Sequence, residues 1–201
     1  IIIDDGSTDG TSELADRLAR EDVRVTVHHN AGNRGLAYSY QRGIALATKN
    51  YTSWVAGNNI VSREALEDLY DRLGTVDTVL SYVKKDVRGW FRRSVSRTLT
   101  ALINIMFGVR MRYFTGPCVY RTDVLQRIQC VSTGTIIVPE VLLRMVKSGL
   151  SYVEIPIQPK ARASGRTKTF RIRNLVAVSI SLVRLFWDMQ IKGTGRVRLT
   201  P

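Results

Sequence analysis

Apolar residues in this chain form short β-branched runs that are separated by stretches with a helical spacing. The first run, Ile1-Ile2-Ile3, ends in two carboxylates and a Gly-Ser-Thr turn, so it predicts a buried strand. Further strands are predicted by the same criteria at residues 23–27, 51–56, 78–83, 118–120 and 152–157. Pro156 interrupts the last of these, which predicts a strand near the edge of a sheet.

Helices are predicted between these strands, because apolar residues recur there every three or four positions. Asp9 and Thr11 are typical first residues of a helix, which would bury Leu14, Ala15, Leu18 and Ala19. The other predicted helices are residues 35–47, 63–73 after a Ser62 cap, 92–107, 139–148 before Gly149, and 175–191. This alternation predicts an α/β fold with a mostly parallel sheet and helices on both faces.

The net positive charge of the chain indicates what kind of molecule it binds. The chain has 30 Lys and Arg against 17 Asp and Glu, a net charge of +13. The basic residues concentrate at 84–97, 160–173 and 192–198. Such an excess indicates an anionic partner, and nucleic acid, nucleotide diphosphates and an anionic membrane surface all qualify.

The segment 175–191 is the most apolar stretch, but Arg184 and Asp188 interrupt it before it reaches the length of a membrane span. Basic residues precede it, and it contains Phe186 and Trp187. This combination is typical of a helix that lies at a membrane interface. A core helix with basic ends is the alternative.

Asp4 and Asp5 end the first predicted strand, at the carboxyl end where open α/β sheets bind ligands. Side chains alternate along a strand, so only one of the two is expected to reach a ligand, and Asp5 is the preferred one. A carboxylate there can accept hydrogen bonds from a ribose or a base. An acidic cap on the following turn is the structural alternative.

A second glycine-rich loop, Asn30-Ala31-Gly32-Asn33-Arg34-Gly35-Leu36-Ala37, leads into the next predicted helix. Glycine lets the backbone approach a ligand closely, and the first turn of a helix favours anions. Taken alone, this loop is a weak signal, and an ordinary turn explains it better.

Together, the two loops resemble those of the family 2 glycosyltransferases, which have the GT-A fold, and especially the branch that transfers sugars to polyprenyl phosphates. Asn30, Gly32, Gly35 and Ala37 keep the order and spacing of that family. The resemblance extends over nearly the whole chain. It implies that the first strand and the nucleotide-binding loop of the family would precede residue 1, so an N-terminal truncation is expected.

The resemblance also implies a site for the nucleotide sugar, formed by the loops that follow the first three predicted strands. The residues that it assigns to this site are Ile3, Asp4, Asp5, Gly6, Ser7, Asn33, Gly35, Ala56, Gly57 and Asn58.

The metal-binding motif of the family is altered in this chain. An Asp-x-Asp motif normally holds Mg²⁺ or Mn²⁺ with the donor diphosphate, whereas Ala56 and Asn58 occupy the two acidic positions here. An Asn58 carbonyl can ligate a hard cation but brings no charge. Three alternatives remain: the donor phosphates supply most of the binding, the metal is dispensable, or the protein is impaired.

The family resemblance assigns the acceptor phosphate to Arg88, Arg92 and Ser96. Arg92 and Ser96 are four residues apart and so lie one turn apart on a helix, and the planar guanidinium group suits phosphate oxygens. A solvated, basic helix start is the structural alternative.

A basic loop at residues 162–168 matches the Arg-x-x-Gly-x-Ser-Lys pattern of the family, with Thr167 in place of Ser. The resemblance implies that Arg162 and Lys168 close over the donor diphosphate. Glu140 matches a family glutamate near the sugar or the acceptor, although a glutamate in the first turn of a helix also has a plain dipole explanation.

The sequence therefore predicts an enzyme that transfers a sugar, with inversion, from a nucleotide-diphosphate sugar to a polyprenyl phosphate. Arg92, Ser96, Arg162 and Lys168 are its expected catalytic residues. Residues 1–170 are expected to form the GT-A domain and residues 171–201 a basic, amphipathic membrane-interface helix and tail. The expected location is the cytoplasmic face of a membrane.

Two alternatives to this function stay open. The loss of the Asp-x-Asp acids favours a catalytically impaired homologue that binds a nucleotide sugar or a lipid phosphate. The net charge alone suggests a nucleic-acid-binding protein, but the sequence contains no recognised binding motif, so nucleic acid is not expected as a partner.

Overall fold

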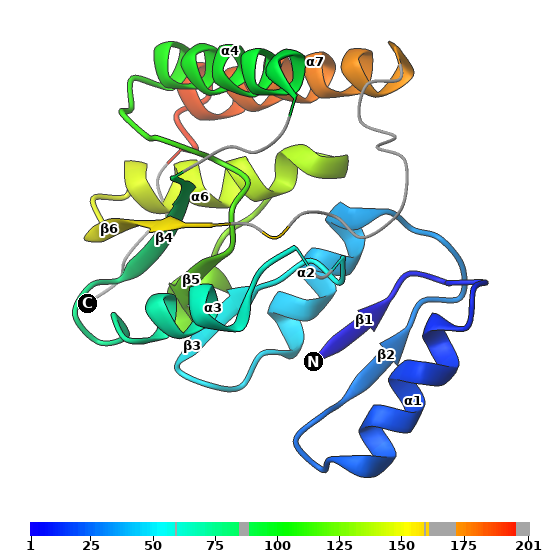
Figure 1. The fold of residues 1–201 in the computed structure, drawn as a ribbon. Helices are drawn as coiled ribbons and strands as arrows, with labels where there is room; N and C mark the ends of the chain where they lie inside the picture. The colour runs from blue at the N-terminus through cyan, green and yellow to red at the C-terminus, as the bar shows by residue number, and fades with distance from the viewer. Residues whose placement is uncertain (59, 85–88, 159, 161–171, 196–201) are drawn as a thin grey trace.

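A computed structural model describes residues 1–58, 60–84, 89–158, 160 and 172–195 (Figure 1). The strands in this part of the chain are β1 (Ile2–Asp4), β2 (Val27–His29), β3 (Tyr51–Trp54), β4 (Thr78–Val83), β5 (Cys118–Arg121) and β6 (Tyr152–Ile157). The α-helices are α1 (Thr11–Glu21), α2 (Leu36–Leu46), α3 (Arg63–Tyr70), α4 (Trp90–Phe107), α5 (Thr122–Leu125), α6 (Ile137–Lys147) and α7 (Ile172–Phe186). A 3₁₀ turn, η1 (Gly134–Ile136), precedes α6, and a π-helical turn, η2 (Trp187–Ile191), continues α7.

Most elements lie where the sequence predicts them, and the strand at 23–27 is the main displacement. β2 begins only at Val27, because residues 22–25 form a turn. In that turn Asp22 accepts a hydrogen bond from the backbone N–H of Arg24, and Val25 donates to the carbonyl of Asp22. Val23 is consequently almost fully exposed.

Helix α1 faces the strands with a different side from the predicted one. Ala15 is buried as expected, whereas Leu14 and Leu18 are exposed. Ser12 and Asp16 bind residues of the strands instead, at Asp4 and His29. Polar contacts, rather than an apolar stripe, therefore set the rotation of this helix.

The strands form two sheets rather than one. β1 and β2 form a parallel pair, and the other sheet has the order β3-β5-β4-β6. The prediction of a mostly parallel sheet is wrong for β5, which runs antiparallel to both β3 and β4. The chain reaches β5 from the long helix α4 and a loop through residues 109–117, so it enters the sheet from the opposite end. β6 lies at the edge, as Pro156 predicts.

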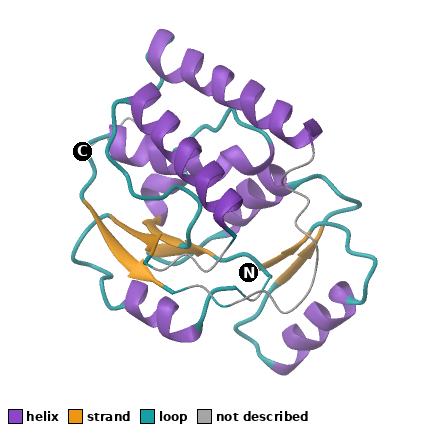
Figure 2. Ribbon diagram, turned by 45° about the horizontal axis from the view of Figure 1, so that its top comes forward, coloured by secondary structure: helices purple, strands orange, loops and turns teal. Residues whose placement is uncertain are grey.

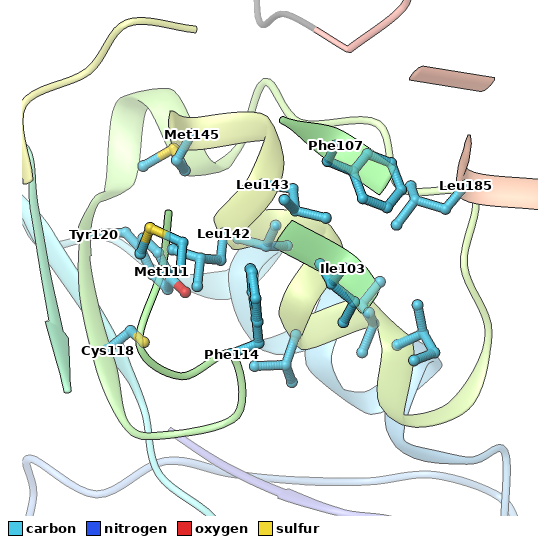
Figure 3. Close-up of a cluster of buried hydrophobic side chains, with 14 of the residues drawn as sticks. Ile103, Phe107, Met111, Phe114, Cys118, Tyr120, Leu142, Leu143, Met145 and Leu185 are labelled. Carbon is cyan, nitrogen blue, oxygen red and sulfur yellow. The ribbon is translucent and has the colours of Figure 1, made fainter. Parts of the chain in front are cut away.

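Helices cover both faces of the larger sheet, as expected for an α/β fold (Figure 2). On one face, Leu69 of α3 packs with Val79, Val119 and Ile155 of the strands. On the other face lies the main apolar core, to which α2, α4, α6 and α7 contribute (Figure 3). Its fully buried members include Ile103, Phe107, Leu142, Leu143 and Leu185.

A network of ion pairs connects η2, near the C-terminal end of the described chain, to α6 in this core. Arg144 of α6 donates to Glu140 on its own helix at 2.8 Å and to Asp188 of η2 at 2.7 Å. Glu140 is fully buried and also accepts hydrogen bonds from the backbone N–H groups of Val131 and Ser132. These contacts place Glu140 in the interior, as a structural anchor of α6, η2 and the loop before η1.

Candidate functional site

Asp4 ends β1 on the side that faces α1. Its carboxylate accepts hydrogen bonds from the backbone N–H of Ser7 at 3.1 Å and from the Ser12 hydroxyl at 2.7 Å, and it pairs with His29 Nδ1 at 2.8 Å. Hydrogen bonds from Ser7, His29 and Ser12 hold the pKa of Asp4 well below its usual range. Asp4 is therefore a buried, ionised anchor for the turn and for the start of α1.

His29 bridges two carboxylates. Its Nε2 atom lies 3.0 Å from Asp16 of α1, opposite the contact with Asp4. The hydrogen bonds to Asp4 and then to Asp16 raise the pKa of the His29 imidazole above its ordinary value. The sequence alone gives no signal of this bridge, because its three members are far apart in the chain.

Asp5 points to the opposite side and holds the second glycine-rich loop. It accepts hydrogen bonds at 2.8 Å from the Asn30 side chain and from the backbone N–H groups of Arg34 and Gly35. Burial raises the pKa of Asp5, but the hydrogen bonds from Arg34, Asn30 and Gly35 outweigh it and leave the pKa below its usual value. The carboxylate of Asp5 thus occupies the position at the start of α2 that favours an anion.

The two loops after β1 and β2 touch at their glycines. Gly6 has a φ of 72°, and a Cβ atom built on it would lie 2.8 Å from the backbone of Gly32. Both the left-handed backbone and this close approach require glycine at position 6. Ser7 and Asn33 are exposed at this junction, on either side of the contact.

Asn30 is the buried centre of the second loop. Its amide donates to Asp5 and to Ser39 of α2, and its oxygen accepts from Arg42 at 2.6 Å. All of its side-chain atoms are therefore used to connect β2, α2 and the first loop, which explains why this polar residue is found in the interior.

The loop after β3 offers a poor site for a metal ion. Ala56 carries no ligand atom, and the side-chain oxygen of Asn58 accepts a hydrogen bond from the backbone N–H of Ile60 at 3.3 Å. No cluster of three or more His, Cys, Asp or Glu residues that could hold a metal occurs within the described residues. The residues present here do not fit a metal held by the protein.

A cavity of about 580 Å³ connects several of the predicted donor residues. Ile3 of β1 and Leu36 of α2 line it, together with Ala56 and Gly57 after β3. Asp4, Asp5 and Asn58 are not among its lining residues.

The predicted acceptor residues fall partly within the described chain. Arg92 and Ser96 both lie in α4, one turn apart as expected, and Ser96 is half-buried. Arg88 lies outside the described residues, as do Arg162 and Lys168 of the basic loop. Lys160, the last described residue before that loop, lies beside the loop that follows β3, because its backbone N–H donates to the carbonyl of Ile60 at 2.8 Å.

Comparison with known proteins identifies the family. Residues 1–130 match the family model described as Glycosyl transferase family 2. The polyprenol monophosphomannose synthase of Mycolicibacterium smegmatis is 31% identical over 182 residues, which cover 84% of this chain and 69% of that protein. The undecaprenyl-phosphate mannosyltransferase of Micrococcus luteus is 29% identical over 84% of this chain and 74% of that protein. The chain belongs to glycosyltransferase family 2.

Solved structures give the fold. The glucosyl-3-phosphoglycerate synthase of Mycobacterium tuberculosis, in complex with phosphoglyceric acid, superposes with a TM-score of 0.68 at 16% identity, over 94% of this chain and 67% of that chain. Another structure of that enzyme, with Mn²⁺, uridine-diphosphate-glucose and phosphoglyceric acid, has a TM-score of 0.68 at 15% identity, over 91% of this chain and 67% of that chain. The fold is that of the GT-A glycosyltransferases.

The bridge at His29 makes stability depend on pH. A raised folded-state pKa stabilises the protein below the unfolded value of about 6.5, and this contribution is lost as the pH rises through the folded value. The lowered pKa of Asp4 adds stability above about pH 4, which is lost in acid. The loss of Tm in a His29→Gln variant should therefore be largest near about pH 5.5 and shrink towards about pH 9. Thermal unfolding of the parent protein and of His29→Gln, from about pH 5.5 to about pH 9, measures this difference in Tm.

His28→Gln is the matched control, because His28 is adjacent and makes no side-chain contact of this kind within the described residues. A loss of Tm at His29→Gln that is the same at every pH, or one that the control reproduces, would contradict the bridge.

The altered metal motif predicts weak binding of Mn²⁺ by the chain itself. Ala56→Asp combined with Asn58→Asp should tighten Mn²⁺ binding by about tenfold or more, because it restores two hard, charged ligands. The electron paramagnetic resonance signal of free Mn²⁺, titrated with and without UDP, measures this. Gln41→Asp combined with Ala45→Asp adds the same charge on the exposed side of α2 and should have no such effect. Equal affinity in the parent chain and the Ala56/Asn58 variant would show that the motif does not limit metal binding.

Proposed function

We propose that this protein transfers a sugar from a nucleotide-diphosphate sugar to a polyprenyl phosphate, with inversion at the anomeric carbon. The observation that carries the proposal is the 31% identity to a polyprenol monophosphomannose synthase over 84% of the chain. A second relative named for the same kind of acceptor, an undecaprenyl-phosphate mannosyltransferase, supports it. The nucleotide-sugar donor is supported by the uridine-diphosphate-glucose complex of the structural neighbour.

The proposed reaction is a direct displacement. An oxygen of the acceptor phosphate attacks the anomeric carbon, the bond from that carbon to the donor diphosphate breaks, and its electron pair leaves with the nucleoside diphosphate. A phosphate monoester has a second pKa of about 6, so its dianion is abundant at neutral pH and no strong general base is needed. The remaining requirements are alignment and stabilisation of the charge that develops on the leaving group.

The basic side chains of the chain suit these two requirements. In the proposed mechanism, Arg92 and Ser96 of α4 bind and orient the acceptor phosphate, and Arg88 extends the same binding site. Arg162 and Lys168 neutralise the departing diphosphate. Arg92 and Ser96 lie one turn apart in α4, which supports their pairing at one phosphate.

The junction of the two glycine-rich loops serves the donor in this proposal. Asp5 fixes the backbone of Arg34 and Gly35, so the exposed groups at Ser7 and Asn33 are presented on a rigid support. Because Ala56 and Asn58 do not fit a metal held by the protein, the proposed steps use the chain's own cations for charge neutralisation.

An acceptor with a polyprenyl chain requires contact with a membrane, and α4 and α7 offer a surface for it. The two helices lie side by side at the top of Figure 1, and Phe107 of α4 packs edge-to-face on Phe186 of α7. The exposed apolar side chains of this surface include Ile105 of α4, with 81% of its surface exposed, and Trp187 of η2, which continues α7, with 56%.

Charge on this surface favours an anionic membrane. Arg184 and Lys192 are exposed beside the apolar side chains. The single acid in α4, α7 and η2 is Asp188, whose carboxylate is bound to Arg144. Helix α7 and η2 contain no candidate membrane span within the described residues. We propose that the helices lie on the membrane surface, with Ile105 and Trp187 entering it.

A homologue that binds these ligands without transferring the sugar is the competing function, and the replacement of both motif acids by Ala56 and Asn58 favours it. The two are separated by incubating the protein with a panel of labelled sugar nucleotides, a polyprenyl phosphate, and either Mg²⁺, Mn²⁺ or EDTA. Transfer of label to the lipid supports the enzyme. Binding of donor and acceptor without transfer from any donor would establish the non-catalytic homologue.

If transfer occurs, Arg92→Ala should lower kcat/KM by about 10²-fold, because it removes a charged partner of the acceptor phosphate. Ser96→Ala should have a smaller effect, of about tenfold, because it removes one neutral hydrogen bond. Initial rates at varied concentrations of polyprenyl phosphate measure both. Arg17→Ala on the exposed side of α1 is the control, and unchanged kinetics in Arg92→Ala would contradict the assignment.

Membrane docking predicts that a double variant, Ile105→Ser with Trp187→Ser, binds vesicles about tenfold more weakly, because it removes one large, exposed apolar group from α4 and one from η2. Sedimentation with vesicles that contain about one third phosphatidylglycerol measures the affinity, and vesicles of phosphatidylcholine alone test the role of charge. Leu14→Ser with Leu18→Ser is the matched control on α1, where both side chains are also exposed. Equal losses in the two double variants would contradict the proposed surface.

A further inference from the structure

A second cavity, of about 460 Å³, lies beside the end of α7. The residues that line it come from α7, from η2 and the turn after it, and from the loop before η1. They are Val131, Val183, Arg184, Trp187, Asp188 and Lys192. None of them belongs to the predicted donor or acceptor sites, so the transfer reaction assigns this cavity no ligand.

The cavity lies along one flank of an apolar stripe. Exposed apolar side chains recur every three or four residues on α7 and η2, at Ile180, Val183, Trp187 and Ile191. Arg184 directly follows one of these positions and Lys192 directly follows another, so both cations lie on the same flank of the stripe. Both are exposed, and neither forms an ion pair within the described residues.

The charge of the cavity favours an anion. Asp188 is the one acid among its lining residues, and its Oδ2 atom accepts hydrogen bonds from Arg144 at 2.7 Å and from the Thr194 hydroxyl at 2.5 Å. Against this acid stand Arg184 and Lys192, so the lining keeps an excess of one positive charge. A group with a single negative charge complements it.

One buried network positions both parts of the lining. Glu140 accepts from the backbone N–H of Val131 at 2.9 Å and from Arg144 at 2.8 Å. Arg144 in turn donates to the carbonyl of Thr194 at 2.7 Å, which fixes the turn that carries Lys192. The shape of the cavity is therefore set before any ligand binds, which lowers the entropic cost of binding.

The π-helical turn η2 lies within this cavity. The backbone N–H of Lys192 donates at 3.0 Å to the carbonyl of Trp187, five residues earlier, rather than to that of Asp188. Such turns are rare and are found frequently at functional sites. The wider turn gives Lys192 a place around the helix that a regular α-helix would not give it.

We propose that this cavity binds the phosphodiester headgroup of one anionic phospholipid. Arg184 and Lys192 contact the phosphate oxygens, and the first carbons of the acyl chains lie against Val183 and Trp187. A free phosphate ester would use the cations but not the apolar stripe, whereas a phospholipid uses both. The inference rests on the membrane contact proposed above and deepens it, because it assigns one headgroup to one place on that surface.

A titration followed by NMR tests the site without a membrane. The probe is dihexanoyl-phosphatidylglycerol, kept below its critical micelle concentration. The indole N–H resonance of Trp187, identified by its absence from a Trp187→Phe variant, and the backbone amide resonance of Val131 should shift with one common Kd. Dihexanoyl-phosphatidylcholine, whose headgroup has no net charge, should bind about tenfold more weakly or less.

A charge variant and its matched control make the result specific. Arg184→Gln with Lys192→Gln should raise the Kd for the phosphatidylglycerol probe by about tenfold or more. Arg17→Gln with Arg20→Gln removes the same charge from exposed positions of α1 and should leave the Kd unchanged. All four side chains are exposed, and thermal unfolding checks that both double variants are folded.

The proposal is overturned by equal affinity for the two lipids, by an unchanged Kd in Arg184→Gln with Lys192→Gln, or by a shift at Trp187 without one at Val131. Glycerophosphoglycerol, the same headgroup without acyl chains, should bind much more weakly. Equal binding of this compound would assign the cavity to a free phosphate ester and overturn the lipid as its occupant. The titration contains neither vesicles nor a sugar donor, so its failure is distinct from a failure of membrane docking or of sugar transfer.

Discussion

Three hydrogen bonds to one carboxylate determine the arrangement of the first half of the molecule. Asp5 holds the start of α2 through Arg34 and Gly35, and it holds β2 through Asn30. Because α2 is packed against β1 through Gly43 and against β3 through Trp54, its position sets the relation between the two sheets. A charged group with internal partners is well suited to this task, because a displaced α2 would deprive this half-buried carboxylate of the N–H groups of Arg34 and Gly35.

The sequence predicts the elements well where the pattern is local. The β-branched runs give Thr78–Val83 and Tyr152–Ile157 their observed bounds, and Ser62 caps α3 by accepting a hydrogen bond from the N–H of Ala65. The two glycine-rich loops and the family to which they belong are also evident, because close backbone contacts such as that of Gly6 demand particular residues. Fold and family therefore follow from short motifs with strong steric requirements.

Contacts between distant residues could not be predicted in the same way. β5 runs antiparallel because of the path through α4, which no short pattern encodes. The alternation of the strand places Asp4 and Asp5 on opposite sides, but it gives no sign that Asp4 binds His29 and Ser12 or that Asp5 binds Asn30 and the start of α2. Glu140 carries an ordinary helix-start signature, yet three hydrogen bonds make it an interior anchor. In each case the deciding partner lies on another element, so tertiary packing overrides the local pattern.

The edge of the larger sheet at β6 offers an incomplete set of backbone N–H donors to a further strand. The carbonyls of Ser151 and Ile157 accept from Thr78 and Lys84, so the intervening even-numbered residues of β6 face outward. Pro156 is one of these, and it has no N–H to offer a further strand. Growth of the sheet is therefore terminated on that side. Pairing of one copy of the chain with another along the β6 edge is therefore disfavoured, and with it the growth of fibres from this side of the sheet.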